Sequence, residues 1–275
     1  MTNNVIYASI VVYKNAANVL KRCIDSILCS GLTAKLYIID NSPTDELKEF
    51  VGGDARIEYI FNPSNSGFGT AHNIAIKNSI ENGVKYHLVL NPDIYFEKGV
   101  IEELYNFMEN NLDVGLVMPR VLYPDGSVQY LCKLLPTPLD LIRRRFLPEK
   151  IFSKQNSLYE LRFTGYNKIM DVPYLSGCFM FIRTEALSRV GLFDERFFMY
   201  LEDTDITRRI YKYYRTVYYP DVSVFHEYEK GSYKNSKLLI YHLRSAVRYF
   251  NKWGYFFDKD RQEINKNVLE KLNAL

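Results

Sequence analysis

The sequence is poor in cysteine and has no long apolar run. Its four cysteines show no C-x-x-C spacing, and each lies in or beside an apolar segment. This pattern predicts reduced, buried thiols, as in a cytosolic protein. No apolar run reaches the roughly 18 to 20 residues that span a bilayer, and the amino terminus lacks the basic region of a signal peptide. We therefore expect a cytoplasmic protein.

The chain also carries little net charge. Its 35 Lys and Arg residues nearly balance 32 Asp and Glu residues, which leaves a formal charge of +3. So small an excess argues against nucleic acid as a partner. The charge is uneven, since residues 226–275 hold ten Lys or Arg against six Asp or Glu. A basic end of this kind fits contact with an anionic membrane or a phosphorylated substrate, and a solvated helix face explains it equally well.

Two common nucleotide-binding fingerprints are missing. Gly67-Phe68-Gly69 begins like the dinucleotide motif, but His72 stands where the third glycine should be. This loop also follows the third expected strand, whereas the dinucleotide motif follows the first. No G-x-x-x-x-G-K-S/T sequence occurs. A nicotinamide-dependent oxidoreductase is therefore disfavoured.

Short apolar strands alternate with helical patterns of about 10 to 15 residues over the first part of the chain, which predicts a doubly wound, mainly parallel α/β sheet with helices on both faces. Asn15 or Asn18 is expected to cap the first helix, and Ser42-Pro43 is expected to open the second. The expected strands are Val5–Tyr13, Lys35–Ile39, Ile57–Phe61, Tyr86–Leu90 and Val114–Met118.

The pattern changes after Met118. A hairpin is expected around Pro124-Asp125-Gly126, and residues 136–168 show no clean period apart from a short amphipathic helix near 139–146. One strand is expected over Val172–Ile182, and two helices, Asn235–Trp253 and Asp258–Leu272, close the chain. We therefore expect one α/β domain over residues 1–225 and a helical extension over 226–275 packed on it.

Polar residues follow four of the expected strands. Tyr13-Lys14-Asn15, Asp40-Asn41-Ser42, Asn65-Ser66-Gly67 and Asn91-Pro92-Asp93 come where the chain leaves the sheet. Parallel strands place such loops along one edge, where α/β sheets bind ligands. Gly67 would let backbone amides approach a ligand closely, and Asp93 could hold a phosphate-bound metal ion. The alternative for Asn91-Pro92-Asp93 is an ordinary turn.

A second acidic cluster, formed by Glu202, Asp203 and Asp205, opens an expected helix after the apolar stretch Phe197–Leu201. The helix dipole alone explains one or two of these carboxylates. A carboxylate placed beside an acceptor hydroxyl could also act as a general base. His226 ends a strand and is the best metal-ligand candidate among the four histidines, although a lone histidine is more often structural.

Taken together and in order, these motifs resemble the family 2 glycosyltransferases of the GT-A fold, especially the rhamnosyltransferase-like branch. The resemblance extends from Val5 to Lys252. It is carried by Val11-Val12-Tyr13, Ile39-Asp40-Asn41-Ser42, Asn65-Ser66-Gly67-Phe68-Gly69 with Asn73, Leu90-Asn91-Pro92-Asp93, Leu175-Ser176-Gly177 and Phe198-Met199-Tyr200-Leu201-Glu202-Asp203-Thr204-Asp205.

The resemblance implies an inverting transferase that uses a nucleotide-diphospho-sugar. By this resemblance Asp203 is the catalytic base, and Asp93 with His226 holds Mg²⁺ or Mn²⁺. Asn91 replaces the first carboxylate of the usual Asp-x-Asp motif, so weaker metal binding is expected. The other implied positions are Val12, Tyr13, Asp40, Asn65, Gly67, Asn73, Asn91 and Asp93 for the donor nucleotide, and Gly177, Glu202 and Asp205 for the pocket between donor and acceptor.

The resemblance also suggests substrates. dTDP-rhamnose is the first choice of donor, followed by UDP-galactofuranose or another UDP-hexose, and the acceptor is expected to be a saccharide on a lipid diphosphate in cell-surface polysaccharide synthesis. Arg143-Arg144-Arg145 among apolar neighbours has the composition of a segment that contacts the inner face of the plasma membrane, or a second subunit in a homodimer. The competing functions are a nucleotidyltransferase and a non-catalytic sugar-nucleotide-binding accessory protein.

Overall fold

The computed structural model describes residues 6–148, 150–227 and 236–274. Val5 and Asn235, where the sequence predicted a strand and a helix to begin, lie outside these ranges. The elements of the first half are β1 (Ile6–Val12), α1 (Ala17–Leu28), β2 (Thr33–Asp40), the 3-10 helix η1 (Glu46–Phe50), β3 (Ile57–Phe61), α2 (Phe68–Glu81), β4 (Tyr86–Leu90), β5 (Ile94–Tyr95), α3 (Val100–Asn110) and β6 (Val114–Leu122).

The second half has shorter elements and begins with a turn in which the Gly126 N–H donates to the Tyr123 carbonyl, close to the predicted hairpin. Its elements are β7 (Cys132–Lys133), α4 (Pro138–Phe146), α5 (Ser153–Tyr159), the 3-10 helix η2 (Arg162–Thr164), β8 (Met170–Asp171), β9 (Tyr174–Leu175), β10 (Phe179–Arg183), α6 (Thr184–Val190), α7 (Glu202–Tyr211), β11 (Arg215–His226), α9 (Ser236–Trp253) and α10 (Lys259–Asn273).

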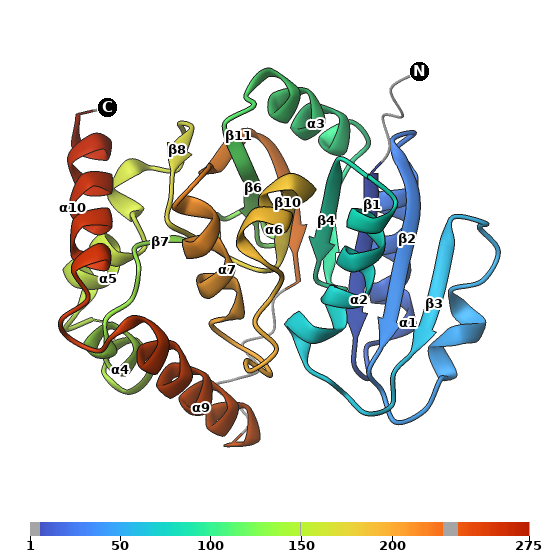
Figure 1. Cartoon of the computed structure of the whole chain (residues 1–275), viewed down its shortest axis with the longest axis horizontal. Helices are drawn as coiled ribbons and strands as arrows, with labels where there is room; N and C mark the ends of the chain where they lie inside the picture. The colour runs from blue at the N-terminus through green and yellow to red at the C-terminus, as the bar shows by residue number, and fades with distance from the viewer. Residues whose placement is uncertain (1–5, 149, 228–235, 275) are drawn as a thin grey trace.

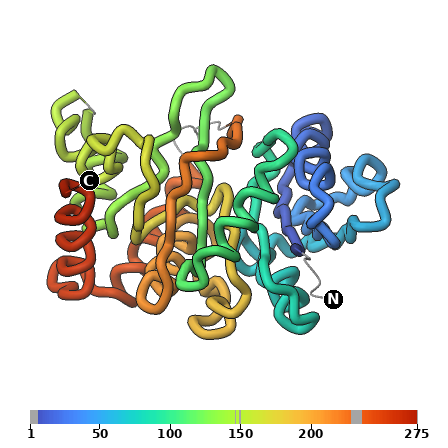
Figure 2. Tube along the Cα trace, turned by 90° about the horizontal axis from the view of Figure 1, so that it is seen from above, coloured from blue at the N-terminus to red at the C-terminus, as the bar shows by residue number. Residues whose placement is uncertain are grey.

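Four parallel strands form one side of the central sheet, in the order β3-β2-β1-β4. Most residues of β1, β2 and β4 are apolar and buried because helices cover both faces, whereas β3 at the edge is only partly buried. Figures 1 and 2 show α1 and α3 on one face and α2, α6 and α7 on the other. The register pairs Val12 with Asp40 and Asp40 with Phe61, so these three strands end in line. The predicted α/β architecture and the shared carboxyl edge are confirmed.

The other side of the sheet is mixed, because β10 runs antiparallel between β4 and β6. β11 pairs parallel with β6 and antiparallel with β5 and β8. The single strand predicted over Val172–Ile182 is wrong, since the chain leaves the extended conformation between Leu175 and Phe179. β9 instead pairs with β7 in a small antiparallel sheet, and the break at residues 176–178 becomes part of the site described below.

Two predicted helix starts are also wrong. Ala16 occupies the N-cap of α1 with no side-chain hydrogen bond, and Asn15 Oδ1 instead accepts from the Tyr13 N–H at 2.8 Å. No α-helix opens at Ser42-Pro43, where the chain forms only η1, four residues further on. Ser42 has another role, because its side chain and backbone fasten neighbouring strand ends.

The closing helices pack on the rest of the molecule. Tyr249 and Phe250 of α9 are buried in a cluster with Phe197 and Leu201, and Leu141 of α4 packs against it. α4 and α9 lie side by side at the lower left of Figure 1. Asn265 of α10 binds the backbone of Leu135 through both amide atoms. The domain boundary at residue 225 stays a prediction.

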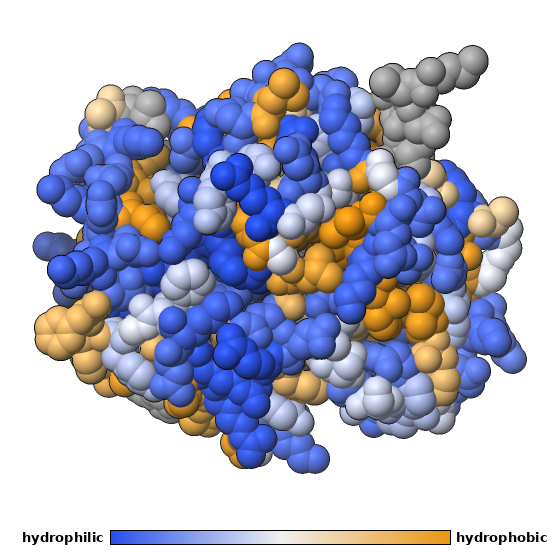
Figure 3. Space-filling view, in the orientation of Figure 1, coloured by the Kyte–Doolittle hydropathy of each residue, from blue (hydrophilic) through white to orange (hydrophobic). Residues whose placement is uncertain are grey.

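The surface in the orientation of Figure 1 is mainly hydrophilic, with apolar side chains in separate groups (Figure 3). Its lower edge is notched between the half built on the parallel strands and the half that contains α7, on the side where β1 and β2 end. Within the described ranges, no helix combines the length and the apolarity that crossing a membrane requires.

Candidate active site

The carboxyl ends of β1 and β2 are joined through Ser42. The Lys14 N–H donates to Ser42 Oγ at 2.8 Å, and the Ser42 N–H donates to Asp40 Oδ1 at 2.8 Å. Tyr59 of β3 donates its hydroxyl to Asp40 Oδ2 at 2.6 Å, and burial together with this carboxylate raises the pKa of Tyr59. Asp40 is therefore a fully buried acceptor whose two oxygens each hold one protein donor.

Val12 and Tyr13 point to different environments. Val12 is buried in the core, whereas the Tyr13 ring is 49% exposed at the rim. Lys14 has a positive φ of 56°, so the backbone turns sharply after Tyr13. This turn leaves an exposed aromatic ring and a lysine beside the buried Asp40, which suits stacking on a base or sugar. Contact of Val12, Tyr13 and Asp40 with a nucleotide stays a prediction.

Gly67 allows a close approach, but to the protein itself. Its φ is +89°, and a Cβ at this position would lie 2.9 Å from the Phe198 carbonyl carbon and would overlap the oxygen. The next N–H, that of Phe68, donates to the Phe198 oxygen at 2.9 Å. The sequence predicted a glycine here for close approach of a ligand, whereas the structure shows close approach of the Phe198 backbone. Gly67 joins the loop that begins at Asn65 to the segment that leads into α7.

Asn73 has a similar internal role. Its Nδ2 donates to the Phe193 carbonyl at 2.9 Å, and its Oδ1 accepts from the Phe193 N–H at 3.0 Å. The side chain is buried within α2. Both halves of the amide are thus used by the backbone of the segment before α7. This bonding favours a structural role, so we leave Asn73 out of the donor site proposed below.

Asp93 and His226 are brought together by strand pairing. β5 follows Asp93 directly and pairs antiparallel with the end of β11, where His226 lies opposite Ile94. Asp93 Oδ1 lies 3.3 Å from His226 Nε2, and His226 Nδ1 lies 2.9 Å from Gln129 Oε1. Asp93 Oδ1 is buried and has no hydrogen-bond partner among the residues that the structure describes.

This pair fits part of a metal site. No cluster of three His, Cys, Asp or Glu residues that could hold a metal occurs within the described ranges. A carboxylate and an imidazole supply two ligands, however, and Mg²⁺ sites typically add waters and substrate phosphates to one or two protein ligands. The orphaned Asp93 oxygen that faces His226 is what such a site requires. Asn91 turns the chain here, since the Ile94 N–H donates to its carbonyl.

Asp203 is the second residue of α7 and is held from two sides. The Gly177 N–H donates to Oδ2 at 3.0 Å, and the Thr204 N–H donates to Oδ1 at 2.7 Å. Burial raises the pKa of Asp203 above its ordinary value, although both hydrogen bonds oppose the change. The approach at Gly177 is tight, because a Cβ would lie 3.1 Å from Asp203 Cβ and 3.5 Å from the Phe68 ring.

The break between β9 and β10 lies between the two acidic loops. Gly177 binds Asp203, and the carbonyl of the next residue, Cys178, accepts from the Asn91 N–H at 2.9 Å. Burial raises the pKa of the Cys178 thiol to about 12, and the nearby carboxylates of Asp93 and Asp203 contribute. The structure therefore brings together the loop that contains Asp93 and the start of α7.

The backbone before Asp203 is strained. Tyr200 and Leu201 have positive φ values of 71° and 66°, which non-glycine residues rarely adopt. α9 holds this turn in place, since Ser245 Oγ donates to the Met199 carbonyl at 2.8 Å and the His242 ring packs edge-on against the Tyr200 ring. Packing by α9 thus stabilises a conformation that aims Asp203 at Gly177.

The other two carboxylates of the cluster differ from Asp203. Glu202 is buried, and burial followed by the Asp203 charge raises its pKa well above the ordinary value. Asp205 was expected to line the pocket, but it is fully buried and accepts from Trp253 Nε1 at 2.8 Å and Arg209 Nε at 2.9 Å. Lys252 Nζ lies 2.7 Å from it. Asp205 therefore fastens α7 to α9 and is not a pocket residue.

Lys133 is a site residue that sequence reasoning missed. It lies in β7 opposite Tyr174, with its ammonium 4.9 Å from that ring centroid. Burial lowers the pKa of Lys133 to about 8, and the Asp203 charge acts on it in the opposite direction. A cationic side chain thus lies near the candidate base. No motif marks Cys132-Lys133, so only the pairing of β7 with β9 reveals it.

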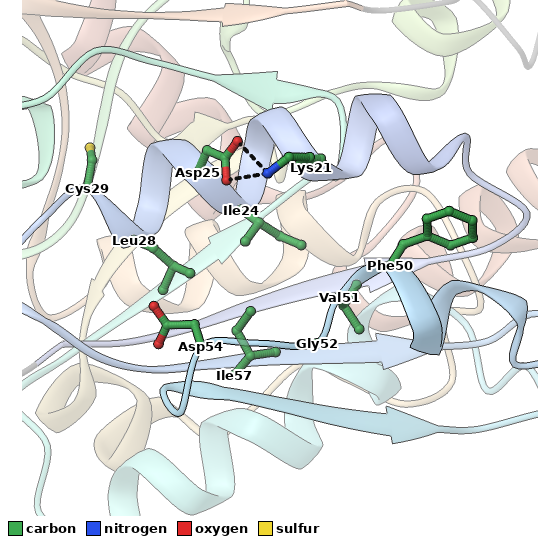
Figure 4. A pocket seen from close by; sticks show the side chains of 10 residues that line it. All are labelled: Lys21, Ile24, Asp25, Leu28, Cys29, Phe50, Val51, Gly52, Asp54 and Ile57. Atoms are coloured by element: carbon green, nitrogen blue, oxygen red, sulfur yellow. Dashed lines mark hydrogen bonds and ion pairs between the residues drawn. The ribbon is translucent and has the colours of Figure 1, made fainter.

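A separate surface cavity lies between α1 and the segment that joins η1 to β3 (Figure 4). Its volume is about 360 Å³, and apolar side chains such as Ile24 and Leu28 line it together with the Lys21–Asp25 ion pair. It contains none of the predicted site residues. The charged side chains that line it are already paired, Lys21 with Asp25 and Asp54 with Arg56, and we assign the cavity no role.

Comparison with known proteins places this geometry in context. Residues 9–191 match the family described as "Glycosyl transferase family 2". An "N-acetylglucosaminyl-diphospho-decaprenol L-rhamnosyltransferase" of Mycobacterium tuberculosis is 27% identical over 245 residues, which cover 83% of this chain and 78% of that protein. "Rhamnosyltransferase WbbL" of Escherichia coli K12 is 25% identical over 87% of this chain and 90% of its own length.

Two solved structures share the fold. The structure of GalNAc-T7 with UDP, GalNAc and Mn²⁺ superposes with a TM-score of 0.65 at 16% identity and covers 98% of this chain. This chain spans only 51% of that protein. The mannosyltransferase PcManGT of Pyrobaculum calidifontis with GDP-Man and Mn²⁺ has a TM-score of 0.56 at 15% identity, over 98% of this chain and 75% of that one. The expected GT-A fold is confirmed.

Proposed function

Because the chain belongs to glycosyl transferase family 2 and is a rhamnosyltransferase-like glycosyltransferase, we propose that it moves a sugar from a nucleotide diphosphate to a hydroxyl of a saccharide acceptor with inversion at the anomeric carbon. One observation carries this proposal. Asp203, a carboxylate whose pKa is raised, is bound by the Gly177 N–H and lies next to the loop that contains Asp93, and the Asp93 carboxylate faces His226.

The donor site lies at the carboxyl edge of the parallel strands. Tyr13 offers an exposed ring, Asp40 fastens the strand ends through its bonds to Ser42 and Tyr59, and the loop from Asn65 to Gly67 closes the edge. We choose dTDP-rhamnose as the donor, since relatives over most of the chain are named rhamnosyltransferases and one is a "dTDP-rhamnosyl transferase" of Shigella flexneri. A UDP-hexose such as UDP-galactofuranose is the alternative.

Asp93 and His226 would hold Mg²⁺ or Mn²⁺ together with the donor diphosphate. When bound there, the divalent ion supplies Lewis-acid neutralisation of the charge that develops on the departing diphosphate. Asp93 would contribute a carboxylate oxygen and His226 the Nε2 nitrogen, and Asn91 would contribute no charge. A site with a single carboxylate binds a cation more weakly than an Asp-x-Asp pair would.

Asp203 acts as the base in a single displacement. As the acceptor oxygen forms its bond to the anomeric carbon, the bond from that carbon to the diphosphate oxygen breaks and the hydroxyl proton passes to Asp203. The hydrogen bonds from Gly177 and Thr204 hold the carboxylate in position. Burial that raises the Asp203 pKa makes it a better proton acceptor, provided that it stays ionised at the working pH.

We propose that the acceptor is a lipid-linked saccharide and that the protein binds to the inner face of the plasma membrane. The outer face of α9 exposes Ile240, Leu243 and Val247 at spacings of three and four residues, and α9 contains no Asp or Glu. Lys237, Arg244 and Arg248 of α9 are also exposed, whereas Arg143 and Arg144 of the neighbouring α4 pair with Asp140 and Glu160. Apolar side chains among basic ones suit an anionic lipid surface. Two copies joined through this face would bring like charges together, which disfavours a homodimer here.

Vesicle flotation tests the membrane contact. The wild-type protein should float with anionic vesicles and less with zwitterionic ones, and Leu243→Asp should reduce flotation. Phe257→Asp is the control and should leave flotation unchanged, because Phe257 is 95% exposed but lies outside α9. Equal flotation of Leu243→Asp and the wild type, or no flotation at all, would remove the membrane contact from the proposal and leave the sugar transfer untouched.

Donor hydrolysis tests the chemistry. The wild-type enzyme should release nucleoside diphosphate slowly from its cognate sugar nucleotide and faster once an acceptor saccharide is present. Asp203→Asn should bind the nucleotide as well as the wild type does but lose the acceptor-dependent rate by about 10²- to 10⁴-fold, the usual contribution of general base catalysis. Retained transfer in Asp203→Asn would refute the assignment, and no turnover of any sugar nucleotide would favour the non-catalytic accessory protein.

A further inference from the structure

Gln129 connects the turn after β6 to the last residue of β11 and uses every polar atom of its side chain. The side chain is buried. Its Nε2 donates to the carbonyl oxygens of His226 at 2.8 Å and Leu122 at 3.3 Å. Its Oε1 lies 2.9 Å from His226 Nδ1. Because two carbonyl oxygens need the amide nitrogen, the amide cannot rotate by 180° without placing oxygen against oxygen.

This orientation determines which ring nitrogen of His226 carries the proton. An amide oxygen only accepts hydrogen bonds, so the imidazole must donate from Nδ1. In the neutral ring, Nε2 then carries a lone pair. That lone pair faces Asp93 Oδ1 at 3.3 Å, although neither atom has a hydrogen to share. Two acceptors at this distance repel each other unless a cation lies between them.

We propose that Gln129 is a positioning residue that locks His226 in the Nδ1–H tautomer and so presents Nε2, together with Asp93, to a divalent cation. The inference rests on the proposed metal site. The lock is part of the sheet, because the Gln129 N–H donates to the Val121 carbonyl of β6 at 2.9 Å. Metal-bound histidines ordinarily donate their other ring N–H to a fixed acceptor, and loss of that acceptor weakens metal binding by about 10- to 100-fold.

The test compares Gln129→Leu with a matched control. Asn265 also uses one buried amide to bind the backbone, since it accepts from the Leu135 N–H at 2.9 Å and donates to the Leu135 carbonyl at 2.9 Å. Asn265→Leu therefore removes a similar pair of bonds far from His226 in the chain. Both variants and the wild type are labelled with ¹⁵N-histidine and titrated with Mn²⁺ alone at the same pH.

In the wild type, the ¹⁵N signals of His226 should show a protonated Nδ1 and a bare Nε2, and Mn²⁺ should broaden them. Gln129→Leu should yield a mixture of tautomers and need about 10- to 100-fold more Mn²⁺ for the same broadening. Asn265→Leu should change neither readout. An unchanged tautomer and Mn²⁺ response in Gln129→Leu, or an equal loss in Asn265→Leu, would overturn the inference.

Donor hydrolysis measured on the same proteins separates this inference from the proposed function. If the wild type hydrolyses no sugar nucleotide while Gln129→Leu still alters the tautomer and the Mn²⁺ response, the proposed function fails and the positioning role stands. If the wild type is active and Gln129→Leu keeps both the tautomer and the Mn²⁺ response, the positioning role fails alone.

Discussion

The ion pair between Arg208 and Asp258 anchors the helix that carries Asp203, and its removal should be costly. Arg208 of α7 is fully buried, and its two terminal nitrogens donate to the two Asp258 oxygens at 2.7 and 2.8 Å. Asp258 also caps α10, since its Oδ1 accepts from the Arg261 N–H at 3.0 Å. Asp258→Ala would therefore leave a buried guanidinium without its carboxylate and α10 without its cap.

The expected loss follows from these contacts. A buried charge left without its partner costs about 3 to 5 kcal/mol, and a lost N-cap about 1 kcal/mol, although the two overlap because one carboxylate serves both. Since domains are stable by only about 5 to 15 kcal/mol, this is a large share. We expect a loss of about 4 kcal/mol in the free energy of unfolding, measured by urea denaturation followed by circular dichroism.

Asp260→Ala is the matched control, two residues further along α10. Asp260 pairs with Lys212 of α7 at 3.0 Å, but the two side chains are 58% and 36% exposed. Exposed pairs contribute about 0 to 1 kcal/mol, so this change should be nearly neutral. Equal losses in the two variants would refute the reasoning. The Arg208 guanidinium holds the pKa of Asp258 below its ordinary value against the effect of burial, so the stability from this pair should be present above about pH 4 and lost on further acidification.

Three other predictions follow from single contacts. Gly67→Ala should lower the free energy of unfolding by about 3 kcal/mol, and Gly83→Ala by about 1 kcal/mol. Both glycines have a positive φ, but only a Cβ at Gly67 would clash with the Phe198 backbone. Equal urea midpoints for the two variants would contradict this. Burial lowers the pKa of His72 well below its ordinary value and that of His87 to about 3, so both should stay neutral in the fold and charge on unfolding. Stability should therefore fall as the pH drops below about 6.5, by about 2 kcal/mol for His87 alone at pH 5, and equal unfolding free energies at pH 7.5 and 5 would argue against it. The rate of sugar transfer should fall on the acid side as Asp203 gains a proton, at a pH above the ordinary Asp value of about 3.9 because its pKa is raised; an acid limb at or below that value would count against Asp203 as the base.

The parallel half of the fold could be predicted from local pattern alone. The bounds of β3 and β4 agree with the expected Ile57–Phe61 and Tyr86–Leu90, because an apolar run between turn residues leaves few alternatives. The break between β9 and β10 could not be predicted in this way, since Tyr174 to Ile182 is continuously apolar apart from Ser176 and Gly177. What interrupts the strand is a long-range bond from the Gly177 N–H to Asp203, which local sequence does not encode.

Some residues of the candidate site could likewise be predicted from the sequence, and others could not. Asp93, His226, Gly177 and Asp203 are recognisable from ordered motifs, and the structure places them on adjoining segments. Asp205 and Asn73 belong to the same motifs but bind the protein's own side chains and backbone. No sequence motif marks Gln129 or Lys133. The fold brings Gln129 to His226, and the pairing of β7 with β9 brings Lys133 to Tyr174.

A thermal-shift screen of dTDP, UDP, GDP and CMP, each with and without Mn²⁺, on the wild type and Asp93→Ala tests the central claim most directly. A ligand that binds only the folded protein raises its stability by mass action, by about 2.7 kcal/mol at a hundredfold excess over Kd. We predict that one nucleoside diphosphate, dTDP by our choice of donor, stabilises the wild type strongly, and that Asp93→Ala loses the added effect of Mn²⁺. No stabilisation by any of the four nucleotides would contradict the nucleotide-sugar site, and a Mn²⁺ effect that persists in Asp93→Ala would contradict the metal site.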